Sequence, residues 1–188
     1  MDKRQTRRDL FARLRGLSVA GQLTASASIR LFLGEDPLFQ HARTVFSFLS
    51  LPGEPDLAPL IDQFPEKRWA FPRVTPEDRI CFHFMSHPGE THKGVHGIRE
   101  PDPSRHPYAA AGEADLFLIP GVGFDPASGA RLGRGTGHYD RYLAAAIAAR
   151  VHEPAHRIGV AFSDQFVTLQ PEEHDIAMHR IVSERGWG

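Results

Sequence analysis

Apolar residues recur along the chain with two spacings, one typical of helices and one typical of buried strands. In the N-terminal segment, Leu10, Leu14 and Leu17 lie at helical spacing among arginines, which predicts a helix. A second amphipathic stretch runs from Val19 to Phe32 and ends before Gly34. A third helix is predicted after Gly137, because apolar residues then recur at helical intervals and give one buried face. These residues are Tyr139, Tyr142, Leu143, Ala146 and Ile147.

Shorter apolar runs bounded by glycine, proline or polar residues predict the strands. The runs are RTVFSFLSL from Arg43, RWAFPRV from Arg68, RICFHFM from Arg79, ADLFLIPG from Ala114 and HRIGVAF from His156. Pro72 lacks a backbone donor, so the second run is expected near a sheet edge or at a strand end. A short helix is predicted from Leu57 to Phe64. Strands that alternate with helices indicate an α/β fold around a layered sheet.

One interval, from Ser86 to Gly112, departs from this alternation because it is dense in proline, glycine and histidine. Connections of this length without regular structure are uncommon in compact domains, and they are usually functional or disordered. Because binding residues concentrate on loops, we favour a loop that faces a substrate over a disordered segment.

The length and net charge of the chain limit its domain number and the partners that it can bind. A chain of 188 residues favours a single domain over residues 1–188, and a net charge of -1 gives no overall attraction to nucleic acid or membranes. No apolar stretch is long enough for a membrane span or a secretory signal. Cys81 is the only cysteine, which excludes an internal disulfide and suits a reducing compartment. We expect a cytoplasmic protein. The arginine-rich N-terminal segment also has a composition found in organelle transit peptides, and a solvated helix face is the alternative.

The stretch GARLGRGTGHYDRYL, from Gly129 to Leu143, is the main candidate for an anion site. Its glycines match neither a Walker loop nor the G-x-G-x-x-G pattern, because His138 occupies the last glycine position. They do lead into a predicted helix whose free N–H groups attract anions, and Arg131 and Arg134 add positive charge. A polyphosphate is the expected ligand, with a flexible surface loop as the alternative. Asp140 lies in the first helical turn, where it can cap the helix or bind magnesium.

The sequence HEPAH, from His152 to His156, matches the zinc protease motif H-E-x-x-H. That motif needs a helix, and Pro154 disfavours one at a cost of about 3 kcal/mol. We therefore interpret the segment as a connection between a helix and a strand.

A second set of histidines lies between the third predicted strand and the proline-rich interval. Its members are His83, His87, His92 and His96. Nothing in their spacing directs them toward one point, and no C-x-x-C pair accompanies them, so a metal site is not expected.

Several separated motifs together resemble the 5-formyltetrahydrofolate cyclo-ligase family, whose members are also called 5,10-methenyltetrahydrofolate synthetases. The longest is DLFLIPGVGFDPASGARLGRGTGHYDRYL, from Asp115 to Leu143. Around it, in the order typical of the family, are Lys3 and Arg7, FLSLPGE ending at Glu54, FPRV from Phe71, GIREP from Gly97 and PEEHD ending at Asp175. The likeness covers nearly the whole chain.

The resemblance implies a three-layer αβα sandwich with a mostly parallel central sheet, similar to sugar-phosphate isomerase-like folds. It implies that ATP and Mg²⁺ are used to convert 5-formyltetrahydrofolate to 5,10-methenyltetrahydrofolate, with release of ADP and phosphate. The residues implied to contact ATP are Lys3, Arg7, Arg131, Gly133, Arg134, Gly135, Thr136, Gly137, His138 and Tyr139. Those implied to contact folate are Leu49, Glu54, Gly97, Ile98, Glu100, Pro101 and His138. Asp140 and Asp175 would serve the metal, and we expect catalytic roles for Arg131, Arg134 and Tyr139.

These residue types suit a phosphoryl transfer to the formyl oxygen followed by attack of the folate N10 on the formyl carbon. Phosphorylation turns the formyl oxygen into a leaving group and activates the carbon, so no protein nucleophile is required. The protein supplies positioning and charge neutralisation. We expect a monomer, or at most a weak dimer, that binds no nucleic acid.

Three positions depart from the family pattern. His138 stands where a first tyrosine of a Tyr-Tyr pair is common, Arg99 replaces an apolar residue, and His179 replaces an acidic one. We expect altered folate affinity and a pH response from His138.

The alternatives to a cyclo-ligase are a non-catalytic folate or nucleotide-binding relative and an RNA-binding module. The sequence lacks the aromatic ribonucleoprotein motifs of such a module.

Overall fold

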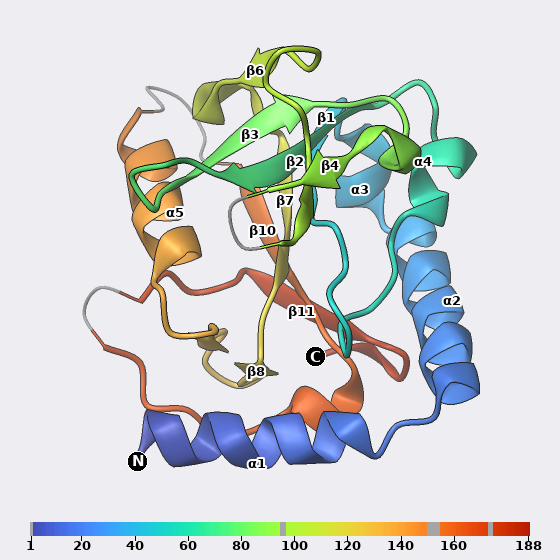
Figure 1. The fold of residues 1–188 in the computed structure, drawn as a ribbon. Coiled ribbons are helices and arrows are strands. Elements are labelled where there is room, and N and C mark those ends of the chain that lie inside the picture. Colours follow the sequence, from blue (N-terminus) through green and yellow to red (C-terminus); the bar gives the residue numbers. More distant parts are fainter. Residues whose placement is uncertain (1, 95–96, 150–154, 173–174) are drawn as a thin grey trace.

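The computed structural model describes the chain apart from residues 1, 95–96, 150–154 and 173–174. Within this described part, the centre is an eight-stranded sheet in the order β12-β11-β10-β7-β1-β2-β3-β6 (Figure 1). The strands from β11 to β2 run parallel, and antiparallel pairs extend this block at both ends. The expected mostly parallel α/β sheet is therefore confirmed.

The sheet strands are β1 (Thr44–Phe46), β2 (Arg68–Val74), β3 (Ile80–Phe84), β6 (Tyr108–Ala109), β7 (Leu116–Pro120), β10 (His156–Val160), β11 (Arg180–Ser183) and β12 (Gly186–Trp187). Two short hairpins pair β4 (His92–Lys93) with β5 (Arg99–Glu100) and β8 (Gly123–Phe124) with β9 (Arg131–Leu132). The α-helices are α1 (Lys3–Arg15), α2 (Val19–Glu35), α3 (Pro37–His41), α4 (Pro59–Gln63) and α5 (His138–Ala149). Short 3₁₀ turns cover Pro88–Glu90, Ala111–Glu113 and Ser163–Gln165.

The central strands are buried on both faces, because their side chains alternate between two apolar cores. On β7, Leu116 and Leu118 pack into the core beneath α2, α3 and α4. Phe117 and Ile119 point the other way, into the core that contains Leu143 of α5. Figure 1 shows α2 and α5 on opposite sides of the sheet. The molecule therefore has the three layers that the resemblance implied.

The first helix crosses the end of the sheet and covers the β8–β9 hairpin, as Figure 1 shows. Asp2 caps α1 by accepting a hydrogen bond from the Arg4 N–H at 2.8 Å. Leu10, which is 1% exposed, packs so closely on Gly123 that a Cβ there would lie 2.6 Å from Leu10 Cδ1. A glycine at this position lets the helix approach the hairpin, and α1 is thereby held beside the carboxyl end of β7.

Most of the predicted elements are confirmed, with two differences of detail. β2 is an interior strand rather than an edge strand, but β1 pairs only with its first half, as far as Ala70. Pro72 lies beyond that point and pairs with Phe82 of β3, so its missing N–H removes no bond to β1. Ile147, expected on the buried face of α5, is 37% exposed because it lies at the rim of the helix contact.

The interval from Ser86 to Gly112 contains more structure than the sequence predicted. It holds β4, β5, β6 and two 3₁₀ turns, and β6 extends the sheet beyond β3. The sequence also gave no sign of β11 and β12 or of the β8–β9 hairpin. These strands are too short to show a periodicity of their own. Among the described residues, no helix combines the length and the apolar character that crossing a membrane requires.

Replacing Leu118 by alanine tests the two-sided core. Leu118 is 1% exposed at the centre of β7, so Leu118→Ala is expected to lower the free energy of unfolding by about 2–5 kcal/mol. Leu31→Ala is the matched control, because Leu31 is 60% exposed on α2 and should change it by less than about 0.5 kcal/mol. Urea unfolding followed by circular dichroism measures both. Equal losses for the two variants would contradict the packing described here.

Candidate functional site

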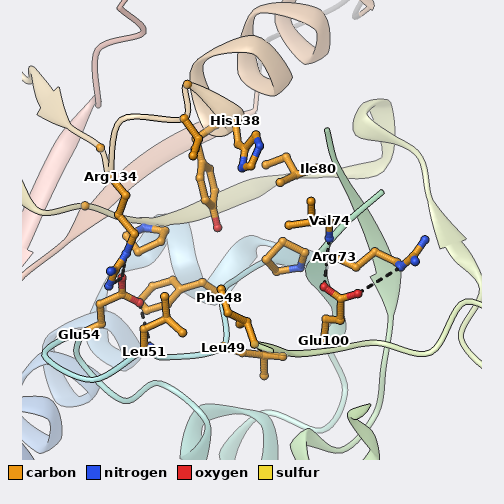
Figure 2. Close-up of a pocket in the computed structure, with 18 of the residues that line it drawn as sticks. Phe48, Leu49, Leu51, Glu54, Arg73, Val74, Ile80, Glu100, Arg134 and His138 are labelled. Atoms are coloured by element: carbon orange, nitrogen blue, oxygen red, sulfur yellow. Dashed lines mark hydrogen bonds and ion pairs between the residues drawn. The ribbon is translucent and has the colours of Figure 1, made fainter. Parts of the chain in front are cut away.

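A cavity of about 170 Å³ opens at the carboxyl ends of β1, β2 and β7. Phe48, Leu49 and Leu51 follow β1, and Pro120 and Gly121 end β7. The chain leaves β1 toward β2 and later returns to place β7 on the other side of β1, so the cavity lies where the strand order reverses. In open α/β sheets, ligands bind at this position. Figure 2 shows the cavity with its apolar floor and its polar walls.

One wall of the cavity is the glycine loop, which we define as residues 132–139, from the end of β9 to the start of α5. Gly135 and Gly137 have φ angles of 108° and 68°, a region that side chains strongly disfavour. Arg131 lies just before the loop and Asp140 just after it. The Arg131 Nη2 donates to both Asp140 carboxylate oxygens, at 2.9 and 2.8 Å. This ion pair fixes the two ends of the loop, and the loop leads directly into the N-terminus of α5.

Two buried polar atoms in this wall lack hydrogen-bond partners in the described part of the chain. They are Arg131 Nε and the Tyr139 hydroxyl. The Arg131 guanidinium carbon lies 5.4 Å from the centre of the Tyr139 ring, so the two side chains form a cation–π contact. Burial raises the pKa of Tyr139, which keeps its hydroxyl a hydrogen-bond donor at neutral pH. Unsatisfied buried groups of this kind mark a place where a ligand can supply the missing partner.

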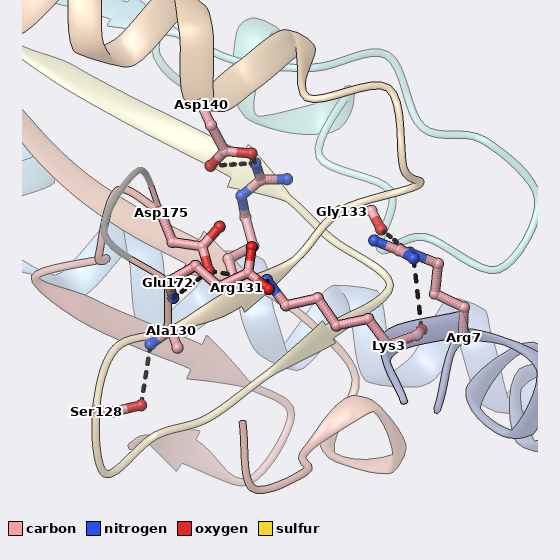
Figure 3. A network of polar contacts seen from close by, with 9 residues as sticks. All are labelled: Lys3, Arg7, Ser128, Ala130, Arg131, Gly133, Asp140, Glu172 and Asp175. Atoms are coloured by element: carbon pink, nitrogen blue, oxygen red, sulfur yellow. Dashed lines mark hydrogen bonds and ion pairs between the residues drawn. The ribbon is translucent and has the colours of Figure 1, made fainter. Parts of the chain in front are cut away.

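The N-terminal helix contributes two cations to the outer side of the glycine loop, as Figure 3 shows. Arg7 Nε donates to the Gly133 carbonyl at 2.7 Å. Lys3 Nζ lies 3.1 Å from Asp175 Oδ2 and 3.2 Å from Glu172 Oε1. The first helix thus places positive charge next to the loop and also beside the C-terminal segment that carries Asp175.

A carboxylate on the opposite wall faces the glycine loop. Glu54 Oε1 accepts from Arg134 Nη2 at 2.8 Å, and Glu54 Oε2 accepts from the Leu51 N–H at 3.0 Å. Burial raises the pKa of Glu54 although Arg134 lowers it. The desolvation effect is the larger because the Arg134 side chain is 42% exposed, so solvent screens its attraction.

Two further walls come from the β2–β3 turn and from the β4–β5 hairpin. His138 Nε2 lies 3.1 Å from Asp78 Oδ1 of the β2–β3 turn. Glu100, which is 3% exposed, accepts from the Val74 N–H at 3.1 Å. Arg73 Nε lies 3.8 Å from the other Glu100 oxygen. Figure 2 shows Glu100 and His138 at different sides of the cavity.

The structure brings most of the predicted site residues to this cavity. The predicted residues that line it are Leu49, Glu54, Ile98, Glu100, Arg131, Gly133, Arg134, Thr136, Gly137, His138, Tyr139 and Asp140. The predicted residues outside its lining are Lys3, Arg7, Gly97, Pro101, Gly135 and Asp175. Arg99, which belongs to the predicted folate-binding loop from Gly97 to Pro101, also lines the cavity. Sequence reasoning missed several lining residues, which are Phe48, Leu51, Pro72, Arg73, Val74, Ile80, Pro120 and Gly121. Most of them lie in the carboxyl-terminal parts of the predicted strands, and that position is the signal that could have identified them.

The predicted metal residues are engaged in ion pairs. Asp140 is paired with Arg131, and Asp175 is paired with Lys3. Among the described residues, no group of three or more histidine, cysteine or acidic side chains is arranged to hold a metal ion. Such a group is not required for Mg²⁺ bound with a nucleotide, because one or two carboxylates together with phosphate oxygens suffice. The two aspartates fit that limited requirement.

The rejected histidine motifs can be placed only in part. Residues 152–154 of HEPAH and His96 lie outside the described residues. His83 contacts the His106 carbonyl and Cys81, and His87 accepts a hydrogen bond from the Gly89 N–H at 3.1 Å. Within the described range, His83 and His87 therefore make hydrogen-bond contacts with neighbouring protein groups.

The model of the 5-formyltetrahydrofolate cyclo-ligase family matches residues 1–184. The chain belongs to this family. Its members are ligases, and the resemblance drawn from the separated motifs is confirmed.

Individual members of the cyclo-ligase family match over different lengths. The 5-formyltetrahydrofolate cyclo-ligase of Mus musculus is 28% identical over 97% of this chain and 93% of its own. That of Mycolicibacterium smegmatis is 43% identical, over 53% of this chain and about half, 49%, of its own length. The NMR structure of Aquifex aeolicus 5,10-methenyltetrahydrofolate synthetase superposes with a TM-score of 0.84 at 30% identity. That match covers 100% of this chain and 92% of the other.

The buried Glu54 carboxyl predicts a pH-dependent stability difference. Because its pKa is raised in the folded protein, folding favours the protonated form, and that contribution is present below pH 4.5. It is lost as the pH rises through the folded-state pKa. Glu54→Gln cannot ionise, so its free energy of unfolding should increase relative to the parent protein as the pH rises from 4.5. Urea unfolding over a pH series measures this difference, with Glu35→Gln as an exposed control. A difference that does not change with pH would show that burial does not destabilise the Glu54 carboxylate.

Proposed function

We propose that this protein catalyses the ATP- and Mg²⁺-dependent cyclisation of 5-formyltetrahydrofolate to 5,10-methenyltetrahydrofolate, with release of ADP and phosphate. The observation that carries the proposal is the cavity at the strand-order reversal, which combines an apolar floor with a cationic glycine loop. Family membership supplies the reaction class. We also propose that residues 1–188 act as one domain, because α1, near one end of the chain, contacts both the glycine loop and Asp175 near the other end.

The nucleotide is proposed to lie along the glycine loop on the side of α1. Lys3, Arg7 and Arg134 offer cationic groups there, and the N-terminus of α5 offers backbone N–H groups. The unpartnered Arg131 Nε is a further donor that points to an anionic ligand. These features fit the phosphates of ATP, because phosphate oxygens accept several hydrogen bonds and favour positive charge.

The folate is proposed to lie in the cavity itself. Its ring would contact the apolar floor formed by residues such as Phe48 and Leu49, while Glu54 and Glu100 would accept hydrogen bonds from ring N–H groups. Burial of both carboxylates makes such bonds strong, because little water competes with the ligand. The formyl group would then face the glycine loop.

In the proposed reaction, the formyl oxygen attacks the terminal phosphoryl group of ATP, and ADP departs. N10 attacks the activated formyl carbon and loses its proton to solvent, and inorganic phosphate leaves with the electrons of the C–O bond. Arg131 and Arg134 would neutralise charge on the transferred group, and the Tyr139 hydroxyl would donate a hydrogen bond near it. When bound, Mg²⁺ would offset negative charge on the phosphate oxygens, and Asp140 and Asp175 would hold it.

The ion pairs in the free protein are consistent with such a role. Arg131 is paired with Asp140, and Lys3 with Asp175, so two of the proposed phosphate contacts are each matched with a proposed metal ligand. Binding of a phosphate together with a cation would let each cation exchange a carboxylate for a phosphate oxygen. The carboxylates would at the same time exchange a cationic side chain for the metal. Neither group would be left buried without a partner, which would otherwise be costly.

The reaction itself is tested by near-ultraviolet absorbance, because the methenyl product extends the conjugation of the folate ring. The purified protein is mixed with 5-formyltetrahydrofolate, ATP and magnesium, beside mixtures lacking ATP or magnesium, and ADP is measured in parallel. We expect product and ADP in equal amounts, and only in the complete mixture. Tight folate binding without turnover would instead establish a non-catalytic relative of the family.

Removing Lys3 tests the proposed nucleotide side. Lys3→Ala should raise the KM for ATP by about tenfold, because a charged hydrogen bond contributes about 1.5–3 kcal/mol, and leave the KM for folate unchanged. The Lys3 side chain is 26% exposed, so the variant should fold. Arg8→Ala is the matched control on α1, since the Arg8 side chain is exposed and donates a hydrogen bond to Gln5 of the same helix. Similar KM values for ATP in both variants would place the nucleotide elsewhere.

A further inference from the structure

The side chain of His106 lies outside the cavity lining but connects both ends of the segment that carries Ile98 and Glu100. His106 is 6% exposed. Its Nδ1 lies 3.0 Å from the Asp102 backbone nitrogen and 3.1 Å from the Asp102 carbonyl oxygen. Nε2 lies 2.9 Å from Glu90 Oε2 and donates to it. One imidazole therefore joins Glu90, before the β4–β5 hairpin, to Asp102, after it.

The same residue is also attached to the sheet. The His106 carbonyl lies 2.8 Å from Nδ1 of His83 on β3, and that imidazole is 7% exposed. The next residue continues the attachment, because the Pro107 carbonyl accepts the Phe84 N–H at 2.8 Å. Through these bonds, the position of the His106 ring is set by a central part of the fold rather than by the loop alone.

On its cavity side, the hairpin contacts β2 through Glu100. Glu100 accepts the Val74 N–H, but within the described part of the chain Glu100 Oε1 and Arg73 Nε have no hydrogen-bond partner although both are buried. Their separation of 3.8 Å is too long for a hydrogen bond. Within the hairpin, the Gly94 N–H donates to the Ile98 carbonyl at 2.9 Å. The placement of Ile98 and Glu100 therefore depends on how the base of the hairpin is fixed.

We propose that His106 and Glu90, which we call the His106–Glu90 clasp, are positioning residues for the substrate-binding wall formed by Ile98, Arg99 and Glu100. The clasp holds the hairpin base so that this wall is in place before the ligand arrives. The identity of that ligand as the folate rests on the proposed function, whereas the mechanical role of the clasp does not.

The location of the clasp separates this role from a general contribution to stability. The Glu90 side chain is 37% exposed, and ion pairs at such positions add little to global stability. The hydrogen bond to His106 lowers the pKa of Glu90, so the carboxylate is charged at neutral pH and the bond is charge-assisted. Loss of the clasp should therefore loosen the hairpin and leave the parallel strands unchanged.

The first experiment measures amide hydrogen exchange without any ligand. In Glu90→Ala, we expect faster exchange for Gly94 and for residues 98–100, with unchanged exchange in β7 and β10. Glu35→Ala, an exposed carboxylate at the end of α2, is the matched control and should match the parent protein throughout. Unchanged exchange in the hairpin of Glu90→Ala would overturn the proposal, whatever the protein binds.

The second experiment measures kinetics with the complete protein. Glu90→Ala should raise the KM for 5-formyltetrahydrofolate by up to about fivefold, because a loss of about 1 kcal/mol reduces the population of the binding-competent hairpin by at most that factor. The KM for ATP and kcat should not change, and Glu90→Gln should restore part of the loss, since its amide oxygen still accepts from His106. Equal changes in both KM values, or no change in either, would overturn the positioning role.

Absence of turnover in the parent protein would refute the proposed function alone, because the exchange experiment decides separately on the clasp. A substitution of His106 itself provides a further check. His106→Asn keeps an acceptor for the Asp102 N–H but cannot reach Glu90, so it should reproduce the effect of Glu90→Ala on hairpin exchange. Should this buried variant not fold, the Glu90 variants still decide the question.

Discussion

The ion pair between Arg131 and Asp140 determines the shape of the glycine loop, and the rest of the site is built on that loop. The Arg131 side chain is 4% exposed, so the pair is formed largely away from water, where an unpaired partner would be costly. Because the pair joins the residues on either side of the loop, the loop cannot open without breaking it. The glycines with positive φ then bend the backbone inside a fixed span.

Contacts from distant parts of the chain reach this loop and depend on its position. Arg7 of α1 donates to the Gly133 carbonyl, and Arg134 donates to Glu54 after β1. His138 lies against Asp78 of the β2–β3 turn. A displaced loop would lose all three contacts together. The contact between Arg7 and the loop also depends on the close packing of Leu10 against Gly123. That packing holds α1 where Arg7 can reach the Gly133 carbonyl.

The sequence predicts those parts of this architecture that depend on local patterns. Buried strands such as β7 are evident because every residue from Leu116 to Ile119 is apolar, and α5 is evident from its helical spacing. β11 is not evident, because its four residues form a short run after a polar segment and become a strand only by pairing with β10. The position of Pro72 was predicted only in part for a related reason, because β2 is an interior strand and Pro72 lies in the half of it beyond the end of β1. Its acceptability depends on where the neighbouring strand β1 ends, and nothing in the β2 sequence reports that.

The candidate site divides in the same way. The glycine loop and its arginines were predicted as an anion site from residue types alone, since glycines, arginines and a helix start adjoin in the sequence. The contact between Lys3 and Asp175 joins residues 172 positions apart, so no spacing rule can predict it, and only the family resemblance indicated both residues. The walls formed by Ile80 and Val74 were missed because they depend on the turn of the β2–β3 hairpin over the cavity.

The two substrates of the proposed reaction would approach from separate parts of the fold. The nucleotide side is formed by α1 and the outer face of the glycine loop, whereas the folate side is formed by the segment after β1 and the β4–β5 hairpin. Only the loop belongs to both sides, and Arg134 joins them directly through Glu54. A phosphoryl transfer between two bound substrates requires both to be fixed relative to one element. In the free protein, the Arg131–Asp140 pair and the contacts of the loop with Arg7 and Glu54 hold the glycine loop in the position where it can serve as that element.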